Sequence, residues 1–367
     1  MNTITDIHVD LVSTPLHSTF VTAQRSTDEV QTVVLRLADD QGRVGWGEGP
    51  ESWRVTGESL AGIKACLEGP LAAVLVGANL DEWPQLLQSV QSAIVGNPSA
   101  KMAADLAVHD LVAQAAGVSV AELLGGPSGG HALPTDVTLS AGSVDDLVGA
   151  ALARVGEGFT TLKLKVGADA SHDLERIEQV RAAVGPDITL RVDANQGWQV
   201  DEAIAIIEGL ATANLGIEAV EQPVRRRDLV GLVRVAAASA LPVMADESVF
   251  DLDDLDDLAR VSEASGGAIG LVNVKLAKCG GLAPARAVID RARELGMKVL
   301  VGSMMESMLG MAAAGALVQA TGQDLVPDLD AAWWGSRSAF EGGPAYGRGV
   351  LVLPDAPGFG VGGLTAS

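Results

Sequence analysis

The chain has 367 residues, of which 48% are hydrophobic, 20% charged and only 3% aromatic, and its formal net charge is -22 at pH 7. This length can bury one large α/β barrel or two ordinary domains. The negative charge argues against nucleic acid or an anionic membrane surface as a partner, because both would repel the protein. Cys66 and Cys279 lack zinc-type spacing and no signal peptide is visible, so we expect reduced thiols in a soluble, cytoplasmic protein.

The first part of the chain predicts strands followed by helices. Alternating apolar residues indicate strands over 4–13, 30–38 and 44–48, with a turn at Asp39-Asp40-Gln41-Gly42. Helical patterns follow near 57–75, 81–94 and 99–116. The last has Ser99 as an expected N-cap and Gly117 as its stop. We therefore expect a small α+β domain over residues 1–125.

From about residue 134 the sequence becomes a repeated unit in which short apolar runs alternate with amphipathic helices. Eight strand candidates separated by helix-length segments predict a parallel β/α barrel, here over residues 126–335. The candidates are VTLS, TLKLKV, ITLRVDA, IEAVEQP, PVMADES, LVNVKLA, KVLVGSM and DLVPDL. No ordinary eighth helix follows Asp330, so the expected fold is a modified TIM barrel of the (β/α)7β type.

The remaining residues, 336–367, form a Gly/Pro-rich tail with one strand-like run at 349–353. We expect this tail to pack back on the amino-terminal domain, so that the two together cap the barrel. The most apolar late stretch, 308–318, is too short and too rich in Gly and Ala to span a bilayer.

Charged residues interrupt the apolar runs at the same point of successive repeats. Barrel enzymes place their active residues at the carboxyl ends of strands, and these positions fall there. They are Lys163 and Lys165 on the second strand, Asp193 on the third, Glu221 on the fourth, Asp246 on the fifth and Lys275 on the sixth.

The three carboxylates, Asp193, Glu221 and Asp246, form a hard oxygen site of the kind that Mg²⁺ prefers, with coordination positions left for substrate oxygens. The structural alternative is that each acid pairs with a nearby arginine or caps a helix. Three acids at equivalent strand ends favour one shared metal ion.

Lys163 and Lys165 lie two residues apart on a strand, so both point into the barrel. Two close ammonium groups near a metal should lower each other's pKa, moving one toward the range of a general base. Lys275 lies on the opposite side of the barrel mouth. The lysines could also form only a salt-bridge network. With a metal between them, however, a bound carboxylate would expose both faces of its α-carbon, which is the arrangement for racemisation or epimerisation.

On these residues the chain resembles the muconate-lactonizing subgroup of the enolase superfamily. The motifs are Lys-x-Lys, Asp-Ala-Asn, Glu-Gln-Pro, Ala-Asp-Glu-Ser and Lys-Leu-Ala-Lys-Cys-Gly-Gly, in this order. The resemblance implies that Asp193, Glu221 and Asp246 bind Mg²⁺ and that Lys165 and Lys275 are the acid/bases, with Lys163 tuning Lys165. It also places Asn195 and Gln222 around the metal ligands. A mandelate-racemase-like His is missing at the seventh strand, and Lys278 reads as a charge at a loop or helix start.

Within the subgroup the chain most resembles the dipeptide epimerases, because Asp328-Leu329-Asp330 follows the eighth strand candidate. In those enzymes such a motif binds the free α-ammonium group of the substrate, through charge-assisted hydrogen bonds. An acidic turn is the structural alternative. Arg25 matches the position where Ala-Glu epimerases bind the side-chain carboxylate, but a solvated loop charge explains it equally. Further substrate-binding candidates are Thr138, Ser303 and Met304.

Two other functions stay open. An N-acylamino-acid racemase or succinylbenzoate synthase of the same subgroup would not need both Asp328 and Asp330. A barrel that binds a carboxylate ligand without turnover would not need all the metal and lysine positions. Trp333 and Trp334 could enclose the substrate's first side chain, stack on a cation or pack the barrel against the tail. Barrels of this size often form symmetric oligomers, and we expect a homo-oligomer.

Overall fold

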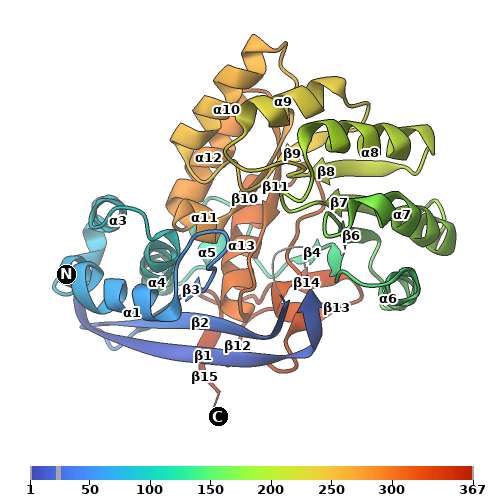
Figure 1. Cartoon of the computed structure of the whole chain (residues 1–367). Helices are drawn as coiled ribbons and strands as arrows, with labels where there is room; N and C mark the ends of the chain where they lie inside the picture. The colour runs from blue at the N-terminus through green and yellow to red at the C-terminus, as the bar shows by residue number, and fades with distance from the viewer. Residues whose placement is uncertain (1, 22–25, 366–367) are drawn as a thin grey trace.

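The computed structural model describes residues 2–21 and 26–365. The chain opens with an antiparallel sheet in the order β1-β2-β3, made of β1 (Ile4–Val21), β2 (Ser26–Asp39) and β3 (Val44–Pro50). The predicted turn is present: Asp39 Oδ1 accepts hydrogen bonds from the backbone N–H of Gln41 and Arg43. The first strand runs past the expected residue 13, because its pairing with β2 continues to Val21 and Ser26 (Figure 1).

A group of helices covers one face of this sheet. They are α1 (Leu60–Cys66), the π-helix η1 (Leu67–Leu71), α2 (Ala72–Leu75), the 3₁₀ helix η2 (Leu80–Glu82), α3 (Trp83–Ser92), α4 (Pro98–Ala116) and α5 (Val120–Leu123). The helix expected over 57–75 is divided by η1, which contains Pro70, a residue with no backbone N–H to donate. Helix α4 begins at Pro98, so Asn97 takes the cap position and the expected Ser99 cap is wrong. Gly117 ends α4 with φ +70°, as predicted.

Three glycines let α4 lie directly on strand β3. Gly45, Gly47 and Gly49 alternate along the strand, and a Cβ on any of them would lie 1.9–2.4 Å from a backbone oxygen of α4. Only glycine permits so close an approach of two backbones. The Gly-x-Gly-x-Gly pattern of β3 therefore fixes how the first helices and the first sheet join.

The middle of the chain forms seven parallel strands in the order β11-β10-β9-β8-β7-β6-β5, with helices on the outside (Figure 1). The strands are β5 (Val137–Leu139), β6 (Thr161–Lys165), β7 (Thr189–Asp193), β8 (Ile217–Glu221), β9 (Val243–Ala245), β10 (Leu271–Lys275) and β11 (Lys298–Gly302). The helices are α6 (Val144–Gly156), α7 (Ala170–Val184), α8 (Val200–Thr212), α9 (Leu229–Ala238), α10 (Leu252–Ala264), α11 (Leu276–Cys279), α12 (Leu282–Glu294) and α13 (Met308–Thr321). The predicted alternation of strand and helix is confirmed.

The eighth position holds an extended segment rather than a regular strand. Asp328 donates its N–H to Val301 O at 2.9 Å on β11, and Pro327 O accepts from Asp136 N at 3.0 Å beside β5. These bonds close the barrel between its first and seventh strands. Pro327 has no N–H of its own, which explains why the predicted DLVPDL strand is reduced to a bridge. The (β/α)7β barrel is confirmed with this change.

An arginine inside the barrel ties the closure together. The buried Arg191 of β7 forms ion pairs with Asp136 at 2.9 Å and with Glu218 at 2.6 Å, and it donates to Val326 O at 2.6 Å. One guanidinium thereby links β7 to three other parts of the barrel wall. Arg191 was not predicted as a structural residue from the sequence.

The last part of the chain is η3 (Ala331–Trp334) followed by short strands, as expected from the missing eighth helix. The strands β12 (Phe340–Gly342) and β15 (Val361–Leu364) pair with each other, whereas β13 (Ala345–Gly347) and β14 (Val350–Val352) form a sheet with β4 (Ala132–Pro134). The tail touches the first domain where Phe359 N donates to Asp110 Oδ1 at 2.8 Å. The domain limits at residues 125 and 335 remain a prediction.

Glu48 joins the first sheet to the barrel. Its carboxylate, at the end of β3, accepts the backbone N–H groups of Ser307 at 3.0 Å and Gly310 at 2.6 Å, at the start of α13. Burial raises the pKa of Glu48, while these hydrogen bonds oppose that shift. The contact positions the capping sheet over the mouth of the barrel. Within the described ranges, no helix is long and apolar enough to cross a membrane.

Candidate active site

The charged residues predicted at the strand ends lie at one end of the barrel. Lys165 is paired in register with Asp193, and Asp193 with Glu221, so β6, β7 and β8 present the three side chains in one layer. Asp246 follows β9 directly, and Lys275 is the last residue of β10. Parallel strands in register bring their carboxyl ends together, and the sequence pattern located this layer correctly.

Lys163 lies at the centre of the carboxylates. Its Nζ is 2.7 Å from Glu221, 2.8 Å from Asp328 and 3.1 Å from Asp193. Lys165 Nζ donates to the same oxygen of Asp193, Oδ2, at 2.6 Å. One carboxylate oxygen therefore lies between the two lysines of the Lys-x-Lys motif.

On the other side of the pocket, Asp246 is held by two lysines. Lys275 Nζ donates to its Oδ2 at 2.9 Å, and Lys278 Nζ donates to its Oδ1 at 2.7 Å. Lys278 is fully buried and also donates to the backbone oxygen of Asn273 at 2.8 Å. Lys278 lies in the short helix α11, as the helix-start alternative expected, but because α11 begins directly after β10 this side chain turns inward to Asp246.

Burial and ion pairing set opposite pKa shifts in the cluster. Burial and the charge of Asp193 raise the pKa of Glu221 to about 7. At Asp328 burial also acts upward, but the charges of Lys163 and Lys275 lower the pKa to about 2. The pKa of Lys163 is raised by Asp328, Glu221 and Asp193 against the effect of burial. The mutual lowering expected between close lysines is therefore not found at Lys163, which is surrounded by acids.

The donor set suits a hard divalent cation. Asp193, Glu221 and Asp246 are buried and offer only oxygen, the donor that Mg²⁺ prefers. Glu221 Oε2 is buried and forms an ion pair with Lys163 Nζ at 2.7 Å. Among residues 2–21 and 26–365, no three such side chains are already arranged as metal ligands, and the Lys163 ammonium contacts both Asp193 and Glu221. The chemistry of the site fits Mg²⁺ once that ammonium is displaced from the carboxylates.

Asn195 and Gln222 hold the acidic residues in place. Asn195 N donates to Asp193 Oδ1 at 2.9 Å, and Gln222 Oε1 accepts the backbone N–H of Asp246 at 2.8 Å. Both residues have positive φ, +42° and +35°, so the chain turns sharply just after β7 and β8. These contacts place Asn195 and Gln222 directly beside two of the candidate metal ligands.

The Asp-x-Asp motif lies in the same pocket, and both of its carboxylates have partners in the protein. Asp328 contacts Lys163, whereas Asp330 Oδ2 accepts from Thr138 N at 2.7 Å and from Trp334 Nε1 at 3.2 Å. Burial and the charge of Asp328 raise the pKa of Asp330 to about 6. An exposed acidic turn is therefore excluded for this motif.

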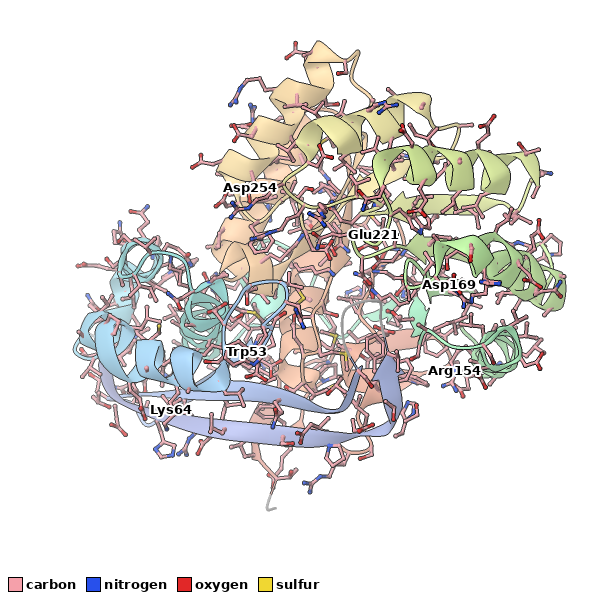
Figure 2. The ribbon with its side chains drawn as sticks, viewed as in Figure 1. Trp53, Lys64, Arg154, Asp169, Glu221 and Asp254 are labelled. Atoms are coloured by element: carbon pink, nitrogen blue, oxygen red, sulfur yellow. The ribbon has the colours of Figure 1, made fainter. Side chains whose placement is uncertain are left out.

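The two tryptophans pack behind the pocket. Trp334 stacks edge-on against Phe20, with ring centroids 5.0 Å apart, and Phe20 lines the pocket. Neither tryptophan is in the described lining of the pocket, and the Arg154 guanidinium lies 4.4 Å from the centre of the Trp333 ring. Figure 2 places Arg154 on α6, away from Glu221 inside the barrel. Of the alternatives for Trp333, stacking on a cation is present, with Arg154 of the protein as the cation, while Trp334 orients Asp330.

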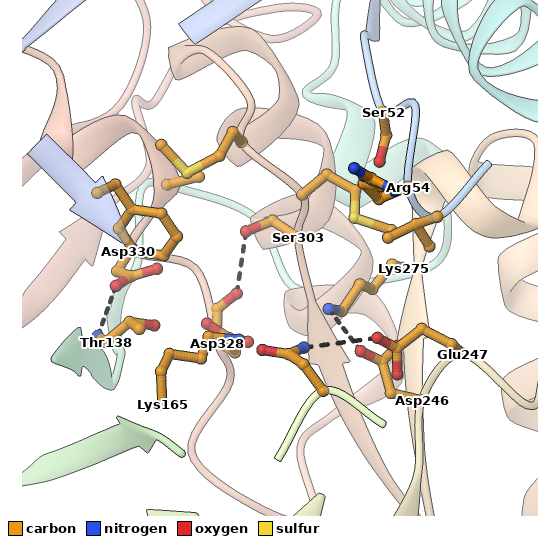
Figure 3. A pocket seen from close by; sticks show the side chains of 16 residues that line it. Ser52, Arg54, Thr138, Lys165, Asp246, Glu247, Lys275, Ser303, Asp328 and Asp330 are labelled. Atoms are coloured by element: carbon orange, nitrogen blue, oxygen red, sulfur yellow. Dashed lines mark hydrogen bonds and ion pairs between the residues drawn. The ribbon is translucent and has the colours of Figure 1, made fainter. Parts of the chain in front are cut away.

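Figure 3 shows the pocket, with Lys165 and Lys275 on opposite sides. Its described lining includes most of the predicted substrate-binding residues, namely Thr138, Ser303, Met304, Asp328 and Asp330. Ser303 Oγ donates to the backbone oxygen of Asp328 at 3.2 Å. Arg25 lies outside the described residues. The loop after β3 brings Ser52, Arg54 and Val55 to the pocket, as expected for a capping segment.

Two residues of the site were missed by the sequence analysis. Glu247 follows Asp246, lines the pocket and is almost fully buried, with its pKa raised to about 7 by burial and by the charge of Asp246. Lys278 is the other, described above. Both adjoin predicted site residues, and the i to i+3 spacing of Lys275 and Lys278 at the start of a helix was the available signal for the second.

Comparison with known proteins agrees with this geometry. Residues 4–125 match the family described as mandelate racemase / muconate lactonizing enzyme, N-terminal domain, and residues 146–363 match the family described as enolase C-terminal domain-like. The chain is 36% identical to the L-Ala-D/L-Glu epimerase of Bacillus subtilis over 97% of this chain and 95% of the relative. The structure of a substrate-liganded complex of that epimerase superposes with a TM-score of 0.94, covering 99% of this chain and 100% of the other.

Two further relatives show the range of the family. A dipeptide epimerase from Enterococcus faecalis, solved with Mg and the dipeptide L-Leu-L-Tyr, is 33% identical with a TM-score of 0.90, over 98% of this chain and 99% of the other. The N-succinyl-L-Arg/Lys racemase of Bacillus cereus is 31% identical over 84% of this chain and 82% of the relative. Fold, strand-end residues and matched families together show that the chain belongs to the mandelate racemase and muconate lactonizing enzyme family of the enolase superfamily.

Proposed function

We propose that this chain is a Mg²⁺-dependent dipeptide epimerase, an isomerase that moves a proton at the α-carbon of the carboxy-terminal residue through an enediolate. The single observation that carries the proposal is the placement of Lys165 and Lys275 on opposite sides of a pocket that also holds three buried carboxylates. Two acid/bases facing each other across one carbon are what inversion at that carbon requires.

Asp193, Glu221 and Asp246 would hold the metal ion, with Asn195 and Gln222 fixing their orientation. When bound, Mg²⁺ supplies positive charge beside the substrate carboxylate, whose negative charge grows as the α-proton leaves. Asp193 accepts from Lys165, and Asp246 accepts from Lys275. Asp193 and Asp246 thereby each also position one of the two acid/bases.

The two lysines then exchange protons with the α-carbon of the substrate, one on each face. One lysine, as the neutral amine, takes the α-proton while the electrons of the C–H bond pass into the substrate carboxylate. The other lysine, as the ammonium, donates a proton to the opposite face of the same carbon. Charge and protons balance, and the roles exchange for the reverse direction. Lys163 contacts Asp193 Oδ2, the same oxygen that binds Lys165, and so influences the charge and position of Lys165.

Asp330 and Asp328 would bind the free α-ammonium group of the dipeptide. Within residues 2–21 and 26–365, both hydrogen bonds to the Asp330 side chain reach Oδ2, so Oδ1 suits a charged donor from the substrate. Thr138 positions Asp330, and Ser303 contacts the Asp328 backbone, while Met304 adds apolar lining. An N-succinyl substrate would place a second carboxylate beside these buried acids and is disfavoured by repulsion. A non-catalytic carboxylate-binding barrel leaves the paired lysines unexplained.

The test is to incubate a library of L,L-dipeptides with the protein and Mg²⁺ in D₂O and to follow deuterium at the carboxy-terminal α-carbon by mass spectrometry. Incorporation that stops on adding chelator supports the proposal. Exchange on N-succinyl amino acids but on no dipeptide would contradict the role of Asp328 and Asp330 and keep the lysine and metal site. We further propose that the protein acts in the cytoplasm and that it forms a homo-oligomer. Sedimentation velocity would test the oligomer.

A further inference from the structure

Asp105 of α4 joins the first helices to the part of the barrel that follows Lys275. Its side chain is fully buried, and Oδ1 accepts the backbone N–H of Leu282 at 2.7 Å. Leu282 is the first residue of α12, a helix whose N-cap is Gly281 and whose first turn has no acidic residue. A carboxylate from α4 therefore takes the place of the cap that α12 does not have within its own sequence.

Two glycines shape this contact. Gly280 and Gly281 have positive φ, +94° and +121°, and both donate their N–H groups to Leu276 O. A Cβ on Gly281 would lie 2.4 Å from the side chain of Asp105, so glycine is needed to leave room for the carboxylate. Gln91 of α3 adds a second contact, because its Nε2 donates to Gly280 O at 2.7 Å. Two of the first helices thus hold this glycine turn.

The glycine turn ends α11, the four-residue helix that starts directly after Lys275. Helix α4 lies against α11 (Figure 1). Four residues make about one helical turn, about 6 Å long, so a shift at one end of α11 reaches the other end. Lys275 and Lys278, at the start of α11 and within it, both donate to Asp246. The contact at Asp105 is therefore one short helix away from a proposed acid/base.

His109, one turn further along α4, fixes Asp105. Its Nδ1 lies 3.1 Å from Asp105 Oδ1, and its buried ring packs edge-on against Trp83 with ring centroids 5.4 Å apart. Burial lowers the pKa of His109, but the charge and the hydrogen bonds of Asp105 outweigh burial and raise it. The same oxygen of Asp105 thus faces both His109 and Leu282, so its position is determined from two sides.

The segment that follows Lys165, across the pocket, is held by the barrel itself. Val166 N donates to Asp193 O at 2.9 Å, and Gly167 N donates to Asp173 Oδ2 at 2.9 Å. Asp193 belongs to β7 and Asp173 to α7. The two proposed acid/bases therefore differ in their support, since the first helices hold the segment after Lys275 and barrel elements hold the segment after Lys165.

We propose that Asp105 is a positioning residue for Lys275, acting through Gly281, Leu282 and α11. This inference rests on the proposed epimerase function. Asp105 is not in the described lining of the pocket, so it acts on the reaction only through the segment that it holds. Because proton transfer requires the base within hydrogen-bond reach of the α-carbon, a displaced Lys275 slows transfer on its own face of that carbon. Transfer by Lys165 stays unaffected.

The experiment measures the initial rate of deuterium incorporation in D₂O from each epimer of one dipeptide, at saturating Mg²⁺ and saturating substrate. Lys275→Ala first identifies the epimer whose exchange depends on Lys275. Asp105→Ala should then lower the rate for that epimer by about tenfold or more, and the rate for the other epimer by less than about twofold. Asp105→Asn keeps an oxygen acceptor for Leu282 N and should lower the first rate by only about threefold, as loss of the charge predicts.

The matched control is Asp110→Asn. Asp110 is also a buried aspartate of α4, but its carboxylate accepts from Phe359 N in the tail at 2.8 Å. This variant should keep the parent's ratio of the two exchange rates. If circular dichroism shows that Asp105→Ala is unfolded, the ratio in Asp105→Asn decides the question.

A loss of exchange that is equal for the two epimers, or larger for the epimer that depends on Lys165, would overturn the inference and leave the epimerase standing. Unchanged rates in both Asp105 variants would overturn it in the same way. If the folded parent exchanges neither epimer of any dipeptide, the proposed function itself is contradicted, and the role of Asp105 with it.

Discussion

Lys163 Nζ lies 2.8 Å from Asp328 Oδ2, which joins the second barrel strand to the segment that replaces the eighth. The contact links the Lys-x-Lys motif with the Asp-x-Asp motif, which lie far apart along the sequence. The two acids of that motif therefore have different partners. Asp328 is paired with a buried lysine, whereas the described hydrogen bonds to Asp330 come from N–H donors. Asp330 is therefore the acid better placed to bind a new cation.

Removing the Lys163 ammonium should destabilise the barrel. In Lys163→Met, the buried acids Asp193, Glu221 and Asp328 would face one another without it. Breaking a buried ion pair in this way costs about 3–5 kcal/mol of unfolding free energy. The measurement is urea unfolding with chelator present, and Mg²⁺ should recover part of the loss by binding only the folded state.

The matched control is Lys298→Met, an exposed lysine at the start of β11. This change should alter the unfolding free energy by less than about 1 kcal/mol. An equal loss in the two variants, or no effect of Mg²⁺ on either, would contradict the proposed charge balance of the site.

Asp330→Asn should weaken the binding of dipeptides with a free amino group. The charge that attracts the ammonium is lost, so KM should rise about tenfold or more with a smaller change in kcat. In the parent, burial and Asp328 raise the pKa of Asp330 to about 6, so KM should fall as the pH increases through about 6 and the carboxylate ionises. Steady-state kinetics between about pH 5 and about pH 8 measures both effects. An unchanged KM, or the same pH profile in the variant, would exclude this role.

Much of the fold and of the candidate site can be predicted from the sequence, because the signals for them are local. Period-two runs ending in a charged residue locate the strands, and parallel strands in register force Lys165, Asp193 and Glu221 into one layer. The fold class, the Gly117 stop and the missing eighth helix were predicted for the same reason. The strand ends depend on few residues close together in the chain.

The features that could not be predicted from the sequence depend on contacts between residues that are far apart in the chain. Lys278 and Asp246 meet only because α11 starts directly after β10, and Arg191 and Asp136 meet only across the closed barrel. The pairing of Asp328 with Lys163 spans the barrel in the same way. No periodic pattern records such long-range partners, so their pKa shifts could not be predicted either.

Asp110 should make stability depend on pH at the contact between α4 and the tail. Burial raises its pKa to about 6, while hydrogen bonds from Phe359 N and Trp46 N oppose the shift. Because the folded pKa lies above the unfolded value, this group favours the folded state at low pH and loses that contribution as the pH rises toward 6. The loss between about pH 4.5 and about pH 7 amounts to about 2 kcal/mol.

The test compares urea unfolding of the parent and Asp110→Asn at both pH values, with the exposed Asp187→Asn as control. The destabilisation caused by Asp110→Asn should be larger at the lower pH, since the variant lacks the titrating group. A difference between parent and variant that does not change with pH would contradict the assignment.

The central claim, proton transfer between two lysines on opposite faces of one carbon, is tested most directly by single-lysine variants. Lys165→Ala and Lys275→Ala, each with Mg²⁺ binding verified by calorimetry, are incubated in D₂O with both epimers of one dipeptide. Each variant should lose epimerisation but still exchange the α-proton of one epimer, a different one for each lysine. Exchange of both epimers by one variant, or retained epimerisation in either, would contradict the account.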